Sequence, residues 1–309
     1  MTAQRSTDDA ADHAATARRA HDLRKVVAWM AGTLVCFSAL AVSLRALSGS
    51  MGVFEMLALR NAAGIAILAV YGRAFAPGQI GAPRPLRLHL LRNAFHWGGQ
   101  ACWTYGVTVL PLATVFALEF TSPAWTMVLA VLFLHERLTA GRVGAVVLGF
   151  IGVLVILRPG LTAFRPDALI VLLAAMLFGV QLTSTKALTA TNSVLNIMFW
   201  MNVLQFPLYV ASHLATGGSP WMWRGLTVGH LPAAFLLCTS GLMAHVCLTN
   251  AFRYGDATTV VPIDFLRIPF IALVGVVLYG EAFDPFVLLG AAISASGILW
   301  SLSESRRRR

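Results

Sequence analysis

The chain contains the same stretch of sequence twice, and each copy holds an odd number of apolar segments long enough to cross a membrane. A shift of 145 residues superimposes six identical residues and also pairs Glu119 with Asp264. The identical pairs are Cys102 with Cys247, Thr104 with Thr249, Thr114 with Thr259, Val115 with Val260, Phe120 with Phe265, and Glu136 with Glu281. A copy that follows an odd number of crossings enters the bilayer from the opposite side, so we expect two inverted halves, as in many transporters.

Nearer the N-terminus the register of the repeat is 141 residues. It places Arg45 on Lys186, and five further residues coincide: Phe37, Ser43, Ala46, Leu47 and Asn61 with Phe178, Ser184, Ala187, Leu188 and Asn202. One short deletion between the second and third spans of the second copy explains the change of register.

Composition excludes a soluble domain. The chain is 58% hydrophobic and 12% charged, with a mean hydropathy of +0.74, whereas a globular domain has about 25% charged residues. Roughly 20 apolar residues cross the hydrocarbon core, and ten such segments begin near Val26, Val53, Leu88, Leu112, Val143, Ala168, Ser193, Leu231, Ala257 and Phe286. The predicted fold is an all-α integral membrane protein with ten transmembrane helices in two inverted five-helix repeats.

The chain divides at the linker that is rich in Pro and Gly. We expect a disordered cytoplasmic tail over residues 1–25, because this segment is polar and lacks apolar periodicity. The first repeat spans residues 26–160, the linker 161–167, the second repeat 168–303, and a basic cytoplasmic C-terminus 304–309.

The net charge of +10 lies in tails and loops beside the spans, so it indicates topology and not a nucleic-acid partner. With the N-terminus inside, sixteen of the 23 Lys and Arg residues are cytoplasmic, and the outer side holds only Arg45, Arg158, Arg165 and Arg224. We therefore expect a multi-pass protein of the inner (plasma) membrane with both termini in the cytoplasm.

The third span has one polar face on an otherwise apolar helix. Arg92, His96 and Gln100 stand four residues apart, and Trp103 continues the same face. We expect this face to line a cavity, with two alternatives left open: Arg92 reaches the membrane interface, or His96 bonds a neighbouring helix. In the second copy Gln100 becomes His245, which we add to the candidate substrate-binding residues.

Glu119 and Asp264 are ionisable residues within spans, which makes them functional candidates. Each lies seven residues into its predicted span, which at 1.5 Å per residue is about 10 Å deep in a core of roughly 30 Å. Asp264 has Arg267 one turn away, so the two form either an internal ion pair or, through Arg267, a site for a carboxylate or phosphate. Glu119 has no such neighbour on its own helix and is favoured for the coupling role.

Several other residues complete the candidate site. Trp103 and Trp125 lie on polar faces and are suited to stacking on a flat or cationic cargo. Glu136 and Glu281 end the fourth and ninth spans, and we interpret them as helix-end or gate residues at opposite membrane faces. Prolines in the same two spans, Pro123, Pro262 and Pro269, indicate kinks that serve either packing or a cavity.

Residues 88–160 resemble an EamA-type repeat of the drug/metabolite transporter superfamily. The resemblance rests on the motifs WTYG (residues 103–106), EFTSP (119–123), HERLT (135–139) and GFIG (149–152), and on DFLRIP (264–269) and GE (280–281) in the second copy. It covers nearly all of residues 26–302 and is greatest to the branch of S-adenosylmethionine and riboflavin carriers. His135 replaces the glycine of the GE motif in the first copy.

The resemblance implies a carrier with a central cavity near the midplane. Together with the intramembrane charges, it favours a secondary transporter of a small polar metabolite by alternating access, either an uptake carrier of S-adenosylmethionine- or riboflavin-like cargo or an exporter of amino acids or related metabolites. An enzyme is disfavoured because Thr139 stands where a zinc-protease motif needs its second histidine. A membrane enzyme or a channel remains the alternative class. The expected partners are a small-molecule substrate and membrane lipid, with a homodimer left open, and we assign no metal, cofactor or nucleic acid.

Overall fold

The computed structural model describes residues 2–126, 128, 140–158, 165–254, 260 and 263–307, and every regular element among them is a helix. The first half holds α1 (Thr2–Leu47), α2 (Val53–Ala74), α3 (Leu86–Val109), α4 (Leu112–Glu119) and α6 (Ala140–Leu157). The second half holds α7 (Asp167–Leu188), α8 (Val194–Ala215), the short η1 (Val228–His230), α9 (Leu231–Tyr254), α11 (Arg267–Tyr279) and α12 (Pro285–Arg307).

Five helical segments in the described part of the chain are long and apolar enough to cross a membrane. They are Leu23–Leu47, Val53–Ala74, Asp167–Thr185, Val194–Ala215 and Val228–Ala251, and three shorter apolar helices accompany them. The 24-residue α3 is long enough but is not among the five, because its polar face lowers its hydropathy. The total of ten spans therefore stays a prediction.

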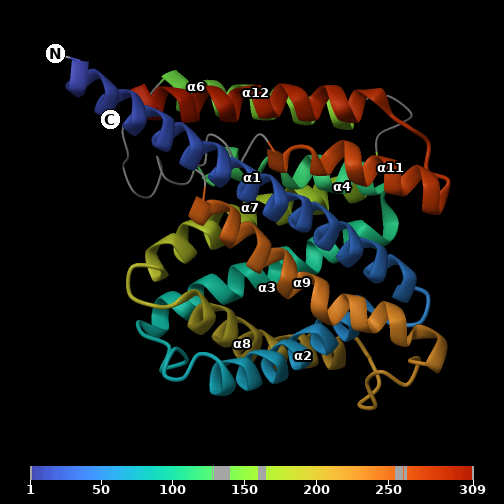
Figure 1. The fold of residues 1–309 in the computed structure, drawn as a ribbon. Coiled ribbons are helices and arrows are strands. Elements are labelled where there is room, and N and C mark those ends of the chain that lie inside the picture. The colour runs from blue at the N-terminus through green and yellow to red at the C-terminus, as the bar shows by residue number, and fades with distance from the viewer. Residues whose placement is uncertain are drawn as a thin grey trace.

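Each described helix of the first half packs on a helix of the second half. The main pairs are α6 with α12, α1 with α9, α3 with α7, and α2 with α8, and α4 packs on α11. In Figure 1, α6 and α12 form one face of the bundle, α2 and α8 lie at the opposite face, and the other helices lie between them. The repeat relates the pair of α1 and α9 to the pair of α7 and α3, so the pairing follows the internal duplication.

Contacts at the helix ends show that paired helices run in opposite directions. Ser193, just before α8, donates to the carbonyl oxygen of Gln79 beyond the end of α2 (2.9 Å), and Trp223, beyond the end of α8, donates to the carbonyl oxygen of Glu55 near the start of α2 (3.0 Å). Contacts between the helix ends show that α4 and α11 are also antiparallel, as are α6 and α12. Since these helices hold equivalent places in the two copies, the two halves run in opposite directions.

Glycines allow α6 and α12 to approach closely. A Cβ atom on Gly152 would meet the carbonyl oxygen of Gly290 and the hydroxyl of Ser294, and one on Gly144 would meet the ring of Trp300. Small residues at such crossings are a common means of packing helices in membranes. The second glycine of the GFIG motif, Gly152, therefore has a packing role in this pair.

Both halves contain a helix that breaks at the same position of the repeat. Helix α4 ends at Glu119, Phe120 and Thr121 form a turn, and helical structure resumes over residues 122–126. In the second half residues 263–264 are helical, Phe265 and Leu266 form a turn, and α11 begins at Arg267. The two breaks meet, because the rings of Phe120 and Phe265 lie 4.6 Å apart.

The prolines of these spans stand just after the breaks. Pro123 and Pro269 lie in the first turn of the following helical segment, where a missing N–H costs no intrahelical bond. Thr121 donates its hydroxyl to the carbonyl oxygen of Leu118 (2.6 Å) and thereby satisfies an acceptor at the break. Pro262 lies outside the described residues.

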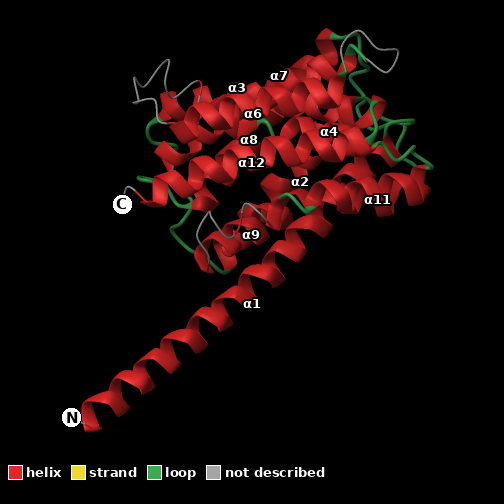
Figure 2. Ribbon diagram, turned by 90° about the horizontal axis from the view of Figure 1, so that it is seen from above, coloured by secondary structure: helices red, strands yellow, loops and turns green. Residues whose placement is uncertain are grey.

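The N-terminal segment differs from the expected disordered tail. Residues 2–25 continue the helix of the first span, so that α1 is a single helix of 46 residues. The N-terminal part of α1 projects away from the bundle (Figure 2). The segment is rich in Ala and Arg, which are strong helix formers and can extend an existing helix without a packing partner.

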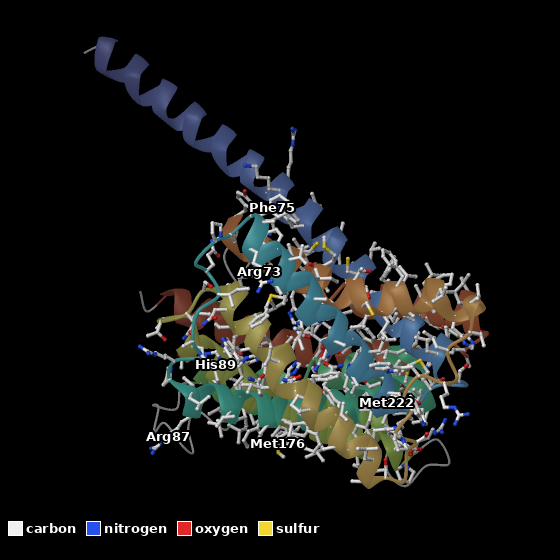
Figure 3. The ribbon with its side chains drawn as sticks, turned by 90° about the horizontal axis from the view of Figure 1, so that it is seen from below. Arg73, Phe75, Arg87, His89, Met176 and Met222 are labelled. Atoms are coloured by element: carbon white, nitrogen blue, oxygen red, sulfur yellow. The ribbon has the colours of Figure 1, made fainter. Side chains whose placement is uncertain are left out.

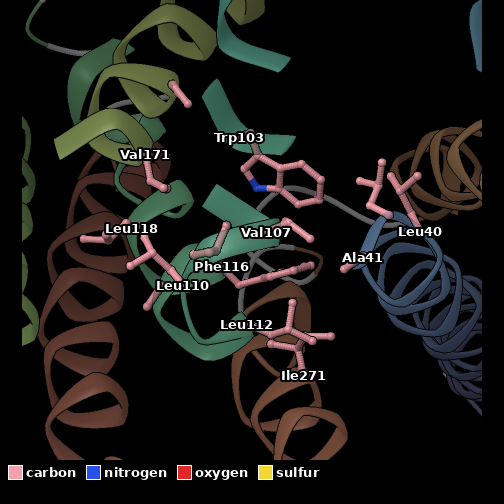
Figure 4. Packing of buried hydrophobic residues seen from close by; sticks show 14 of the residues in the cluster. Leu40, Ala41, Trp103, Val107, Leu110, Leu112, Phe116, Leu118, Val171 and Ile271 are labelled. Atoms are coloured by element: carbon pink, nitrogen blue, oxygen red, sulfur yellow. The ribbon is translucent and has the colours of Figure 1, made fainter. Parts of the chain in front are cut away.

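Among the described residues, the largest apolar cluster lies where α1 and α3 end and α4 begins (Figure 4). It includes Leu40, Leu44, Val107, Leu112 and Phe116, and we call this side of the bundle the Leu47 end. A smaller cluster around Val26, Met30 and Ala251 lies toward the opposite side, which we call the Lys25 end. Arg87 and Met222 mark the Lys25 and Leu47 ends in Figure 3.

Candidate functional site

A cavity of about 240 Å³ lies between the two halves and is lined by residues from both. Seven of the predicted site residues line it: His96, Gln100, Trp103, Glu119, His245, Asp264 and Arg267. Arg92 and Trp125 are not among its lining residues, Glu281 lies at the Leu47 end, and Glu136 lies outside the described residues.

Arg267 lies between the carboxylates of both halves, next to the two helix breaks. Its Nη2 donates to Asp264 Oδ2 (3.1 Å), and its Nη1 lies 3.8 Å from Glu119 Oε1. The predicted pair of Asp264 and Arg267 is therefore present, but Glu119 joins it from the other half. If all three groups are ionised, the cluster carries one excess negative charge.

Aromatic rings surround this guanidinium. Its Cζ atom lies 4.3 Å from the ring centroid of Phe37 and 4.6 Å from that of Phe120, which are distances typical of cation–π contacts. Arg267 is 5% exposed, yet its Nε and Nη1 atoms and Asp264 Oδ1 have no hydrogen-bond partner among the described residues. Buried polar atoms of this kind are costly, so the cluster retains capacity to bind a further polar group.

Trp103 holds the Glu119 carboxylate from the third span. Its indole Nε1 donates to Glu119 Oε2 (2.8 Å), and its ring contacts Phe116 edge-on at 5.7 Å. The side chain is 3% exposed. Trp103 therefore orients the carboxylate that approaches Arg267 from the first half.

The polar face of α3 divides between the cavity and a neighbouring helix. His96 lines the cavity, and its Nδ1 lies 2.9 Å from the amide nitrogen of Gln205 on α8, so both alternatives for this residue coexist. Arg92 is buried away from the cavity and donates to Thr185 Oγ1 (2.7 Å) and Asn93 Oδ1 (3.0 Å). It thus holds α3 against α7 rather than extending to the interface.

Trp125 packs within the bundle. Its ring contacts Phe150 of α6 in an edge-on arrangement at 5.1 Å, and its Cβ lies beside Gly179 of α7. Stacking of Trp125 on a cargo has no support in this geometry.

Glu281 forms an ion pair with Arg45 at the Leu47 end. The same carboxylate accepts the N–H of Leu112 at the start of α4 (3.0 Å), and Arg45 donates to the carbonyl oxygens of Val107 (2.7 Å) and Leu110 after α3. This Arg45–Glu281 bridge joins the ends of α1 and α11 to the corner between α3 and α4. Sequence reasoning placed Glu281 at a helix end but did not identify Arg45 as its partner.

The glycine before Glu281 explains how the carboxylate reaches this place. Gly280 adopts φ +62°, a left-handed conformation that ends α11, and the N–H of Glu281 returns to the carbonyl oxygen of Gly275 (3.2 Å). The chain therefore turns back, and the side chain of Glu281 lies against Gly275.

Further cavity residues were not singled out as site residues from the sequence. They include Phe37 and Phe178, which are equivalent in the repeat, and Arg60, Gln181 and Asn202. The identity of Phe37 and Phe178 in the 141-residue register was a usable signal for the first pair. Among the described residues no group of three or more His, Cys, Asp or Glu side chains is arranged to hold a metal ion.

Comparison with known proteins gives relatives of similar length. A protein from Rickettsia bellii named S-adenosylmethionine uptake transporter is 26% identical over 91% of this chain and 94% of its own length. A riboflavin transporter from Rhizobium johnstonii is 33% identical over 71% of each chain. A pseudopaline exporter from Pseudomonas aeruginosa is 25% identical over 83% of this chain and 88% of its own.

A solved crystal structure shares the fold, with a TM-score of 0.63 at 17% identity over 92% of this chain and 98% of that one. The family profile described as the EamA-like transporter family matches the chain twice, over residues 24–158 and 166–303. With the apolar helices, these matches indicate a multi-pass membrane transporter of the drug/metabolite transporter superfamily rather than an enzyme. The chain belongs to the EamA-like transporter family.

Proposed function

We propose that the protein is a secondary active carrier of a small polar metabolite in the inner membrane, working by alternating access of its two inverted halves. The observation that carries the proposal is the cluster of Glu119, Asp264 and Arg267 at the meeting point of two broken helices. Discontinuous helices that bring charged groups to a central cavity are a recurrent substrate-site design in secondary transporters.

Within this cluster, we assign the coupling role to Glu119. Asp264 is hydrogen-bonded to Arg267 at 3.1 Å, whereas Glu119 is 3.8 Å from the same guanidinium. A proton or a cationic group of the cargo can therefore neutralise Glu119 while the pair of Asp264 and Arg267 stays intact, because that pair has no net charge. Binding of a proton or a monovalent cationic group at Glu119 raises the charge of the cavity by one unit, and its release reverses the change.

The Arg45–Glu281 bridge supports the alternating cycle. It ties four helix ends together next to the largest apolar cluster, so we assign this conformation to the state that is closed at the Leu47 end. With both termini in the cytoplasm, the Leu47 end faces outward. Release of the bridge would open the cavity to the outside.

Counterflow in proteoliposomes tests the proposal. Vesicles preloaded with unlabelled S-adenosylmethionine, riboflavin or amino acids should accumulate the matching labelled compound in a saturable manner for at least one of them.

A variant of Glu119 tests the coupling role. Glu119→Gln should lower gradient-driven uptake by about tenfold or more, since it removes an ionised group within the membrane. Asp167→Asn, which alters a partly exposed carboxylate at the Leu47 end, is the matched control. Unchanged uptake by the Glu119 variant would remove this residue from coupling, and linear, unsaturable flux would indicate a channel.

The direction of transport is a separate question. The named relatives include both uptake transporters and an exporter. Inside-out and right-side-out vesicles distinguish the two directions for the same labelled compound, because an exporter accumulates its cargo in the inside-out preparation when the physiological gradient is imposed.

A further inference from the structure

Arg60 is a buried cation that meets no anion in the described part of the chain. It lies in the interior of α2, is 9% exposed and lines the cavity. It makes no hydrogen bond or ion pair with the described residues. Its titratable neighbours are Tyr209, Cys238, His96 and His245, and none of them is a carboxylate.

Such an arrangement is unusual in a membrane-embedded interior. A buried charge is normally paired, because an isolated ion loses its hydration without compensation. Arg92, another buried arginine of the first half, has three neutral partners that fix its guanidinium. Arg60 lacks such partners within the described ranges, so its five N–H donors are available to a group that enters the cavity.

The repeat gives no structural reason for an arginine at this position. The equivalent residue in the second copy is Met201, which also lines the cavity, so an uncharged side chain fits the same place on the scaffold. Arg60 and Gly241 of α9 also lie side by side, with the Arg60 Cδ 3.6 Å from where a Cβ on Gly241 would be. The glycine leaves space beside the guanidinium stem.

The same cavity has the opposite imbalance at its other charged group. Glu119 and Asp264 provide two carboxylates for the single guanidinium of Arg267. The rings of Phe37 and Phe178 line the same cavity. The site therefore offers one uncompensated positive group, one uncompensated negative group, and flat apolar surfaces.

We propose that the cargo is an amphoteric solute whose carboxylate or phosphate binds Arg60 and whose cationic group binds the Glu119 carboxylate, while Asp264 stays paired with Arg267. This inference rests on the proposed carrier function and narrows its substrate class. Arginine is suited to such a role because its planar guanidinium binds carboxylate and phosphate through two parallel hydrogen bonds. S-adenosylmethionine has this charge pattern, with a carboxylate, an ammonium and a sulfonium group, whereas riboflavin carries no charge at neutral pH.

The test uses two compounds that differ only in the carboxylate. Proteoliposomes are assayed for uptake of labelled S-adenosylmethionine, with unlabelled S-adenosylmethionine or its decarboxylated analogue as competitor. For the unaltered protein we expect the carboxylated compound to compete at least about tenfold better, the effect of one charge-assisted hydrogen-bonded pair. In Arg60→Met, which copies the residue of the second half, the two competitors should become equal.

Arg60→Lys and a stability measurement separate recognition from folding. The lysine variant retains the charge and should keep part of the preference, and the thermal unfolding of both variants in detergent shows whether they are folded. A folded Arg60→Met variant that keeps the full preference for the carboxylated compound overturns the proposal. So does uptake of riboflavin without uptake of S-adenosylmethionine, which leaves the carrier function intact. Absence of counterflow for every compound tested would instead contradict the carrier function.

Discussion

The indole N–H groups of two tryptophans on α3, Trp97 and Trp103, have different surroundings. Trp103 donates its N–H to Glu119 at 2.8 Å, whereas Nε1 of Trp97 is buried and has no hydrogen-bond partner among the described residues. Both are aromatic residues six positions apart on one helix, and the sequence separates them only through the face on which Trp103 lies. The acceptor, Glu119, lies on the next helix, so the hydrogen bond could be identified only from the structure.

This difference gives a matched pair of substitutions. Trp103→Phe keeps an aromatic ring beside Phe116 but removes the donor to Glu119, and we expect gradient-driven uptake to fall about tenfold, because a hydrogen bond to a charged group is lost. Trp97→Phe removes an N–H that has no partner in the described ranges and should change uptake by less than about twofold. The comparison uses initial rates in proteoliposomes, at equal amounts of folded protein. Equal losses in the two variants would contradict the role of the Trp103 hydrogen bond.

At the scale of the elements, the two broken helices are the main departure from the sequence prediction. The prolines predicted kinks within continuous spans, but the chain turns at Phe120–Thr121 and at Phe265–Leu266, and Pro123 and Pro269 lie in the segments that follow. Proline restricts the conformation of the preceding residue and lacks an N–H, so it favours a break upstream of itself. The two breaks meet at the contact between the rings of Phe120 and Phe265, which the sequence alone did not reveal.

Gly275 on α11 allows a test of the Arg45–Glu281 bridge without changing either charge. A Cβ at this position would collide with the Glu281 carboxylate, so Gly275→Ala should displace the carboxylate from Arg45 and from the Leu112 N–H. Loss of about 1 kcal/mol from the closed state corresponds to about a fivefold increase in opening at the Leu47 end.

The measurement is the rate at which a maleimide labels Leu47→Cys, a fully buried position at this end, after the native cysteines are replaced by alanine. Gly98→Ala on α3 is the control, because its added Cβ would make only an ordinary contact with Leu177 (3.4 Å). Labelling that is no faster with Gly275→Ala than with the control would show that the bridge does not hold this end closed.

At the scale of the whole molecule, equivalent residues of the two halves have different surroundings. Ala41 is fully buried, whereas Leu182, its counterpart, is 47% exposed. Gln100 is buried, and its counterpart His245 is exposed. The repeated sequence therefore adopts two environments in one conformation, as expected if the state observed is closed at one end and not at the other.

The inversion of the halves in the membrane can be measured directly. Gln79 and Ser219 are exposed and lie in the loops that follow the second helix of each copy, α2 and α8. In intact cells, a membrane-impermeant maleimide should label Ser219→Cys, and it should label Gln79→Cys only after permeabilisation, because the loops face opposite sides. Both variants are made in a background whose native cysteines are replaced by alanine. Labelling of both positions from the same side would disprove inverted topology.

The sequence by itself determined the duplication, the helical class and the starts of most helices, because repetition, hydropathy and proline or glycine signals are local properties of the chain. Val53, Leu112 and Leu231 begin helices as predicted. It also placed seven cavity residues, since intramembrane polar groups are rare enough to be noticed. Only the tertiary structure decided which charges meet in the described part of the chain. Glu119 meets Arg267 and Arg45 meets Glu281, whereas Arg60 meets no anion. Those pairings arise from the packing of two halves that are far apart in sequence, and no local pattern encodes the distance between them.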